Sequence, residues 1–185
     1  MIKIAHESPK SIFEEVQRFT DYDYALVHLF EEDEEYWNQF KQAALKGREI
    51  ILDNSIFELE EAFDADKFNH WVNKLKPTWY IVPDALEDAY ETIAKMEDWN
   101  NKGLGYLGSG KIGVVQGKTY DEIVDCYNFM NKDAGVDMIA ISFDYSWYQT
   151  ITFSNLFASS APPDKTISPS IKMCTRSGFK ESKIL

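Results

Sequence analysis

Short apolar runs recur along the chain between residues 2 and 142, and each is followed by a polar residue that can do chemistry. The runs cover residues 2–5, 24–27, 50–52, 79–83, 112–115 and 138–142. Runs this short and continuous are typical of strands whose two faces are both covered, so the pattern predicts six buried strands. The polar residues just beyond them are His6, His28, Asp53, Asp84, Gln116 and Asp144.

Stretches with helical spacing separate most of these strands. Apolar residues keep a helical period within residues 9–19, 33–46, 64–75, 86–99 and 119–130. Alternation of strand and helix predicts an α/β fold with a parallel sheet and right-handed crossovers. Six such units fit either an open doubly wound sheet or an incomplete (β/α)8 TIM-barrel-like fold. No phosphate-binding glycine motif follows any of the strands.

The alternating pattern stops after Asp144. Residues 150–185 are rich in Ser, Thr, Pro and Lys and have no amphipathic period. Such a composition cannot bury enough apolar surface to hold a fold. We therefore divide the chain into a barrel-like domain, residues 1–149, and a poorly structured basic tail, residues 150–185. We interpret the tail as the result of a truncation or frameshift.

The carboxyl ends of parallel strands meet at one face of the sheet, so the polar residues listed above are expected to share a pocket. Asp53 and Asn54 follow one strand directly, and a carboxylate beside an amide can hold a polar ring or act as a general base. Phe57 lies close enough to stack on a planar base. In the alternative interpretation, Asp53 and Asn54 only cap the next helical element.

Asp84 and Gln116 end the next two strands. Two carboxyl groups at neighbouring strand ends, Asp53 and Asp84, raise each other's pKa and suit base recognition or acid–base chemistry. The Gln116 amide offers both a donor and an acceptor to a nucleobase edge, and Gly117 allows a flat ligand to approach the backbone. The alternatives are that Asp84 caps the following helix and that Gln116 bonds to a neighbouring loop.

His6, His28 and Asp144 are further candidate pocket residues. No third ligand stands at metal-binding spacing from the two histidines, so we predict neither a metal nor any other cofactor.

The two cysteines form no spaced cluster, which favours a reducing cytoplasm over a disulfide scaffold. The chain has no apolar run of ~18 residues and no basic-then-apolar N-terminus, so neither a membrane span nor a secretory signal is predicted.

The net charge of −12 disfavours a chain that wraps nucleic acid through phosphate contacts. Residues 151–185 carry five basic against two acidic side chains, so the acidic excess lies in the barrel-like domain. A bound nucleic acid would therefore need a local basic patch or a basic partner.

One group of motifs resembles the queuine/archaeosine tRNA-guanine transglycosylase superfamily, and is closest to its short phage-type relatives, some of which are linked to inserting 7-deazaguanine bases into DNA. Residues 111–117, KIGVVQG, are similar to the family's GIVQGG segment, and a helix and a strand follow in the family's order. Residues 53–58, DNSIFE, are similar to its DSGGFQ loop. Asp84 matches the aspartate that ends the intervening strand. Order and spacing agree across residues 1–147.

The resemblance implies a (β/α)8 barrel that exchanges guanine in tRNA or DNA for a deazaguanine base. It implies that Asp84 and Gln116 bind the heterocycle's edge and that Asp53 acts as acid or base. The family's nucleophile is a later aspartate, which forms a covalent intermediate at the ribose. That region and the family's CxCxxC zinc segment are missing here, and Asp144 stands one strand too early for the nucleophile. Glu58, Ile56 and Lys118 replace a Gln and two Gly of the family pattern.

Three functions remain open at this point. The first is base exchange, with catalysis in doubt because the nucleophile region is missing. The second is a non-catalytic phage protein that binds a base, a nucleotide or another protein. The third is an unrelated (β/α) hydrolase or lyase that uses Asp53 and Asp84. An incomplete barrel also leaves strand edges exposed, which predicts a homo-oligomer.

Overall fold

The computed structural model describes residues 3–141. Asp144 and the predicted tail, residues 150–185, lie outside the described residues, as does the predicted boundary at residue 149. All other residues predicted to form the site fall within them.

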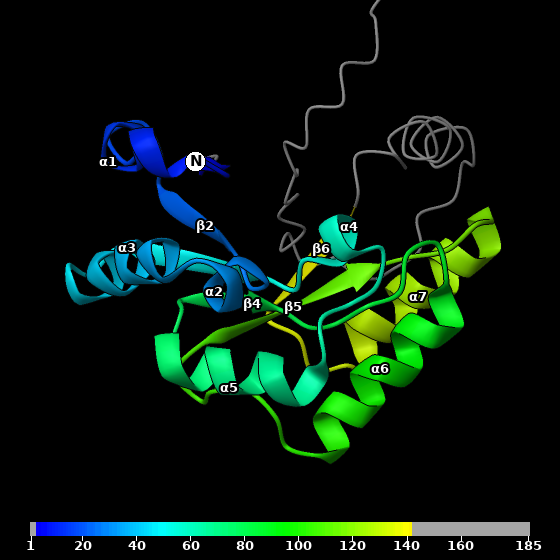
Figure 1. Cartoon of the computed structure of the whole chain (residues 1–185). Coiled ribbons are helices and arrows are strands. Elements are labelled where there is room, and N and C mark those ends of the chain that lie inside the picture. The colour runs from blue at the N-terminus through cyan, green and yellow to red at the C-terminus, as the bar shows by residue number, and fades with distance from the viewer. Residues whose placement is uncertain (1–2, 142–185) are drawn as a thin grey trace, which may run out of the picture.

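All six predicted strands are present, and helical segments separate them (Figure 1). The strands are β1 (Ala5–His6), β2 (Tyr22–Leu26), β3 (Glu49–Asp53), β4 (Trp79–Ile81), β5 (Gly110–Val115) and β6 (Met138–Ile141). The helices are η1 (Lys10–Ile12), α1 (Phe13–Val16), α2 (Leu29–Glu32), α3 (Glu34–Leu45), α4 (Ile56–Leu59), α5 (Ala65–Leu75), α6 (Ala89–Asn101) and α7 (Tyr120–Lys132).

The strands form one parallel sheet in the order β1-β2-β3-β4-β5-β6. A doubly wound sheet reverses its strand order at a switch point, so this uninterrupted order rules out that alternative for the described residues. Right-handed crossovers between successive strands place their helices on the same side. The sheet curls away from these helices, giving a half-barrel with α5, α6 and α7 along its outer side (Figure 1).

Alternation along each strand gives the sheet two apolar faces. The outer-face residues pack with the helices in a large core that contains Phe40, Phe68 and Trp99. The inner-face residues form a second buried cluster, made of Tyr22, Tyr24, Leu26, Ile51, Ile81, Ile112, Met138 and Ala140. Both faces of the sheet are therefore apolar, as the short continuous runs predicted.

The helix boundaries differ from the sequence expectation at two places. The helix expected over residues 9–19 is a 3-10 turn followed by one short α-helix. The helix expected from residue 86 begins only at Ala89, because Glu87 has a left-handed φ of 56°. Asp88 then caps α6, with its Oδ1 accepting from the Glu91 amide at 2.9 Å. Asp84 is thus not the cap of this helix, and its carboxyl group is used elsewhere.

Within the described part of the chain, β1 and β6 each pair on one side only. The predicted homo-oligomer through these edges stays a prediction. No helix within residues 3–141 is long and apolar enough to cross a membrane.

Candidate functional site at the strand ends

Three polar side chains from successive strand ends form a buried chain of hydrogen bonds. The Asn54 Nδ2 group donates to Asp84 Oδ1 at 2.7 Å, and the Gln116 Nε2 group donates to Asp84 Oδ2 at 2.6 Å. Asn54, Asp84 and Gln116 are only 1–3% exposed. A carboxyl group held between two carboxamides is therefore the centre of the predicted site, and it joins the ends of β3, β4 and β5.

The turn after β3 sets the position of Asn54. Asp53 Oδ1 accepts from the Ser55 amide at 2.6 Å, and Asn54 Oδ1 accepts from the Ile56 amide at 3.0 Å. Ser55 has a left-handed φ of 60°, a conformation that costs a non-glycine residue energy and that these two bonds stabilise. The N-cap residue of α4 is Ser55, so Asp53 and Asn54 do not cap this helix but hold the turn before it. The Asn54 Nδ2 group meanwhile donates to Asp84 and to the Val82 carbonyl.

Burial raises the pKa of Asp84 to about 6. Removal from water disfavours the charged carboxylate, and the nearby Asp53 adds to this effect, while the amide groups of Gln116 and Asn54 oppose it. Asp53 therefore acts on Asp84 in the direction that the sequence predicted. Desolvation, which the sequence did not reveal, has the larger effect.

The other end of Gln116 holds the loop after β4. Its Oε1 accepts from the Glu87 amide at 3.1 Å, so the alternative of a bond to a neighbouring loop is also correct. The backbone N–H of Gln116 donates to Cys126 Sγ at 3.5 Å, and burial raises the pKa of that thiol. One side chain thus links the Asp84 carboxyl group to the backbone of the loop that follows it.

Gly117 is required by the chain's own packing. A Cβ atom at this position would lie 2.9 Å from the backbone nitrogen of Ile123 and 2.9 Å from Glu122 Cβ. Both atoms belong to the first turn of α7, which Thr119 and Glu122 close with a reciprocal capping box. Glycine here lets the helix approach the strand end, a reason the sequence did not reveal.

We expect Gly117→Ala to destabilise the fold by about 1–3 kcal/mol, because the backbone of α7 must move to make room. Urea denaturation of the variant beside Lys118→Ala, which changes the next residue without adding a Cβ, measures this effect. Equal stability of the two variants would show that the helix adjusts freely.

The remaining predicted residues are more scattered. His6 is exposed at the end of β1, and His28 precedes α2 with its Nδ1 buried and without a hydrogen-bond partner in the described residues. Phe57 lies on α4 and is 47% exposed. Among residues 3–141, no three His, Cys, Asp or Glu side chains come together in a group that could hold a metal.

Two tyrosines at the strand-end face were not singled out from the sequence. The Tyr24 hydroxyl donates to Asp53 Oδ2, and the Tyr36 hydroxyl accepts from the Leu26 amide at 3.0 Å. Burial raises the pKa of Tyr36, and the nearby carboxylates Glu7, Asp53 and Glu58 raise it further. The strand register could have pointed to Tyr24, because Tyr24 lies on the same face of the sheet as Asp53 and diagonally across from Asp53.

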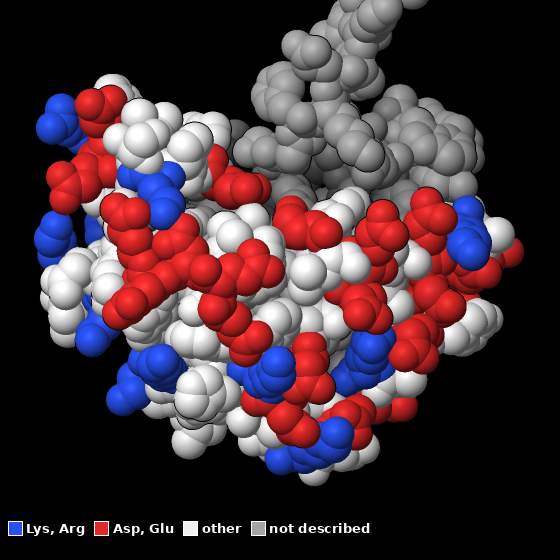
Figure 2. All heavy atoms as spheres, in the orientation of Figure 1, with Lys and Arg blue, Asp and Glu red and all other residues white. Residues whose placement is uncertain are grey.

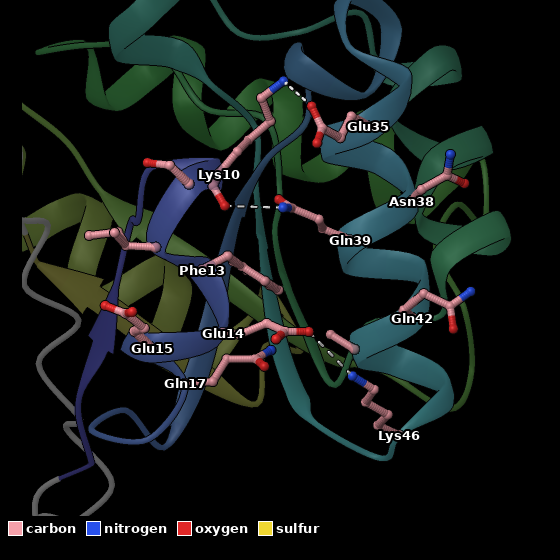
Figure 3. A pocket seen from close by; sticks show the side chains of 13 residues that line it. Lys10, Phe13, Glu14, Glu15, Gln17, Glu35, Asn38, Gln39, Gln42 and Lys46 are labelled. Carbon is pink, nitrogen blue, oxygen red and sulfur yellow. Dashed lines mark hydrogen bonds and ion pairs between the residues drawn. The ribbon is translucent and has the colours of Figure 1, made fainter.

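A separate groove of about 530 Å³ lies between α3 and the N-terminal helical segment η1–α1 (Figure 3). Ion pairs cross it near both ends, between Lys10 and Glu35 at 2.9 Å and between Lys46 and Glu14 at 3.9 Å. Gln39 lies between them and donates to the Lys10 carbonyl at 3.1 Å. The lining of this groove includes none of the predicted site residues.

Acidic side chains outnumber basic ones by 28 to 14 within residues 3–141. Figure 2 shows them spread across one face of the molecule, with the basic groups mainly toward its edges and lower part. This surface repels a polyanion at long range.

No protein-family model matches the chain, and no curated protein is similar to it in sequence.

Proposed function

We propose that the Asn54–Asp84–Gln116 cluster binds the polar edge of a guanine or 7-deazaguanine base. The observation that carries the proposal is the buried Asp84 carboxyl group held between two carboxamides from adjacent strand ends. A carboxylate has about four lone-pair directions, and the two amide bonds use two of them. The others suit the neighbouring N–H donors of a guanine edge.

Access to this cluster requires a movement of the chain. Asp53, Asn54, Asp84 and Gln116 are 1–4% exposed, so a base reaches them only when part of the covering structure opens. The segment best suited to move is the four-residue helix α4, since left-handed residues stand at both of its ends. Its exposed Phe57 would then be available to stack on the base.

Base exchange is the more specific part of the proposal, since it adds a reaction to the binding of a base. The resemblance to the transglycosylase superfamily supports it, as does the sequential parallel order of the six strands, which a closed (β/α)8 barrel also has. In this scheme Asp53 acts as acid or base beside the bound heterocycle. The polymer would be tRNA or DNA, presented to the acidic surface by a basic partner.

A second candidate is a protein that binds a free base without exchanging it. The twofold excess of acidic side chains favours it, because a free base, unlike a polynucleotide, is not repelled by this surface. A hydrolase or lyase that uses Asp53 and Asp84 is the third candidate.

Thermal denaturation with guanine, 7-deazaguanine and adenine tests the recognition step. At a concentration about 100 times Kd, we expect the first two bases to stabilise the protein by about 2.7 kcal/mol, a rise in Tm of about 5–10 °C. Adenine lacks the paired N–H donors and should give a smaller rise. We expect the rise to disappear in Asp84→Asn and Gln116→Ala and to persist in Gln42→Ala, an exposed amide on α3.

Equal shifts with adenine and guanine would contradict edge recognition, and no shift with any purine would contradict both base-binding candidates. Incorporation of labelled guanine into tRNA and duplex DNA then separates exchange from binding alone.

A further inference from the structure

Tyr24 lies on the inner face of the sheet, beneath the strand end that carries Asp53. The β2–β3 register pairs Leu26 with Asp53, so Tyr24 is the residue diagonally across from Asp53 on the same face. A diagonal separation of ~7–8 Å is within reach of a phenol side chain. The Tyr24 hydroxyl donates to Asp53 Oδ2, and Tyr24 is buried at 7% exposure.

We infer that Tyr24 is a positioning residue for the strand-end site, holding the Asp53 carboxyl group ionised and in one orientation. Its donor bond stabilises the carboxylate over the protonated acid. The second oxygen, Oδ1, is held by the Ser55 amide at 2.6 Å, so hydrogen bonds fix both ends of the carboxyl group. As far as it concerns base exchange, this inference rests on the proposed function.

The strand-end carboxyl groups are thereby given different roles. Asp84 accepts from two side-chain amides in a desolvated position, whereas Asp53 accepts from a phenol and a backbone amide. Acid–base chemistry needs two carboxyl groups whose surroundings give them different pKa values, so that one is protonated while the other is ionised. Tyr24 makes Asp53 the proton acceptor of the two.

Other titratable groups also act on this region. The carboxylates of Glu7, Asp53 and Glu58 all raise the pKa of the Tyr36 hydroxyl, which lies on α3. Asp53 also acts on Asp84 from the neighbouring strand end. Neighbouring carboxylates disfavour one another's ionisation, and a donor bond to a carboxylate, such as the one from Tyr24 to Asp53, acts in the opposite direction.

The first test is a carbon-13 NMR titration of the full chain, with the Asp53 carboxyl resonance identified as the one that Asp53→Asn removes. In Tyr24→Phe we expect the Asp53 titration midpoint to rise by about one pH unit, because one donor to the carboxylate is lost. Tyr22→Phe is the matched control, since Tyr22 lies two residues earlier on the same inner face with the same exposure. An unchanged midpoint in folded Tyr24→Phe, or equal shifts in both variants, would overturn the inference.

The reciprocal measurement does not depend on the folding of Tyr24→Phe. In Asp53→Asn the phenol of Tyr24 should titrate at lower pH than in the unaltered chain, because the carboxylate that disfavours the phenolate is gone. A Tyr24 midpoint that stays in place contradicts the inference.

The two proposals fail separately. If guanine does not stabilise the unaltered chain but the Asp53 midpoint rises in Tyr24→Phe, the proposed function is wrong and the role of Tyr24 stands. If guanine binds and the Asp53 midpoint does not move, base recognition stands and Tyr24 is only a packing residue.

Discussion

Replacement of Asp84 by Asn is expected to remove a pH dependence of about 2 kcal/mol from the stability of the fold between pH 4.5 and pH 7.5. Burial raises the folded-state pKa of Asp84 to about 6, whereas an unfolded aspartate titrates near ~3.9. Between these two values the folded state binds more protons than the unfolded state. Stability contributed by this group is therefore present at low pH and decreases as pH rises toward 6.

Urea denaturation of the unaltered chain and of Asp84→Asn across this pH range measures the difference. The unaltered chain should lose stability relative to the variant as pH rises, and Asp98→Asn, an exposed carboxylate on α6, should follow the unaltered chain. Parallel curves for all three proteins would show that Asp84 is not desolvated. Asp84→Asn also places its new NH2 group against one of the two donors, Asn54 Nδ2 or Gln116 Nε2. Because two donors cannot bond to each other, this lowers the stability of the variant by about 1–3 kcal/mol at every pH.

Arg48→Met is expected to destabilise the fold by about 3 kcal/mol, because it leaves the buried Asp23 carboxylate without its counter-charge. The Asp23 side chain is 2% exposed, and Arg48 Nη2 lies 2.8 Å from its Oδ1. Arg48 also donates to the Thr20 carbonyl at 3.0 Å, and Gln17 donates to Asp23 Oδ2 at 2.6 Å. This network ties the beginning of β2 to the beginning of β3, at the opposite end of the sheet from Asp53.

Equilibrium urea denaturation at pH 7 compares Arg48→Met with Lys102→Met, which breaks an exposed ion pair with Asp98 and should change little. The double variant Asp23→Leu/Arg48→Met should recover much of the lost stability, since it leaves no unpaired buried charge. A small loss in Arg48→Met, similar to that of the control, would mean that Gln17 alone is sufficient to hold the Asp23 carboxylate.

The six strands and most helix starts could be predicted because they depend on local pattern. Continuous apolar runs marked the strands. Asp33 and Asp64, which begin two of the predicted helical stretches, cap α3 and α5 by accepting from the Tyr36 and Lys67 amides. The prediction was wrong where a single left-handed residue changes the local path, as at Glu87, since such a conformation leaves no periodic signal at a non-glycine residue.

The sequence by itself determined the α/β alternation, the parallel sheet and the set of polar residues at strand ends, because periodicity and strand direction are carried by the chain locally. Tertiary structure decided which of those residues meet. Asn54, Asp84 and Gln116 come together because their strands are neighbours in a sheet of uninterrupted order, which excludes the doubly wound alternative for residues 3–141. Tertiary structure also decided that Tyr24 donates a hydrogen bond to Asp53 and that burial raises the pKa of Asp84. Both depend on contacts between segments distant in sequence, which set the strand register and the removal of water.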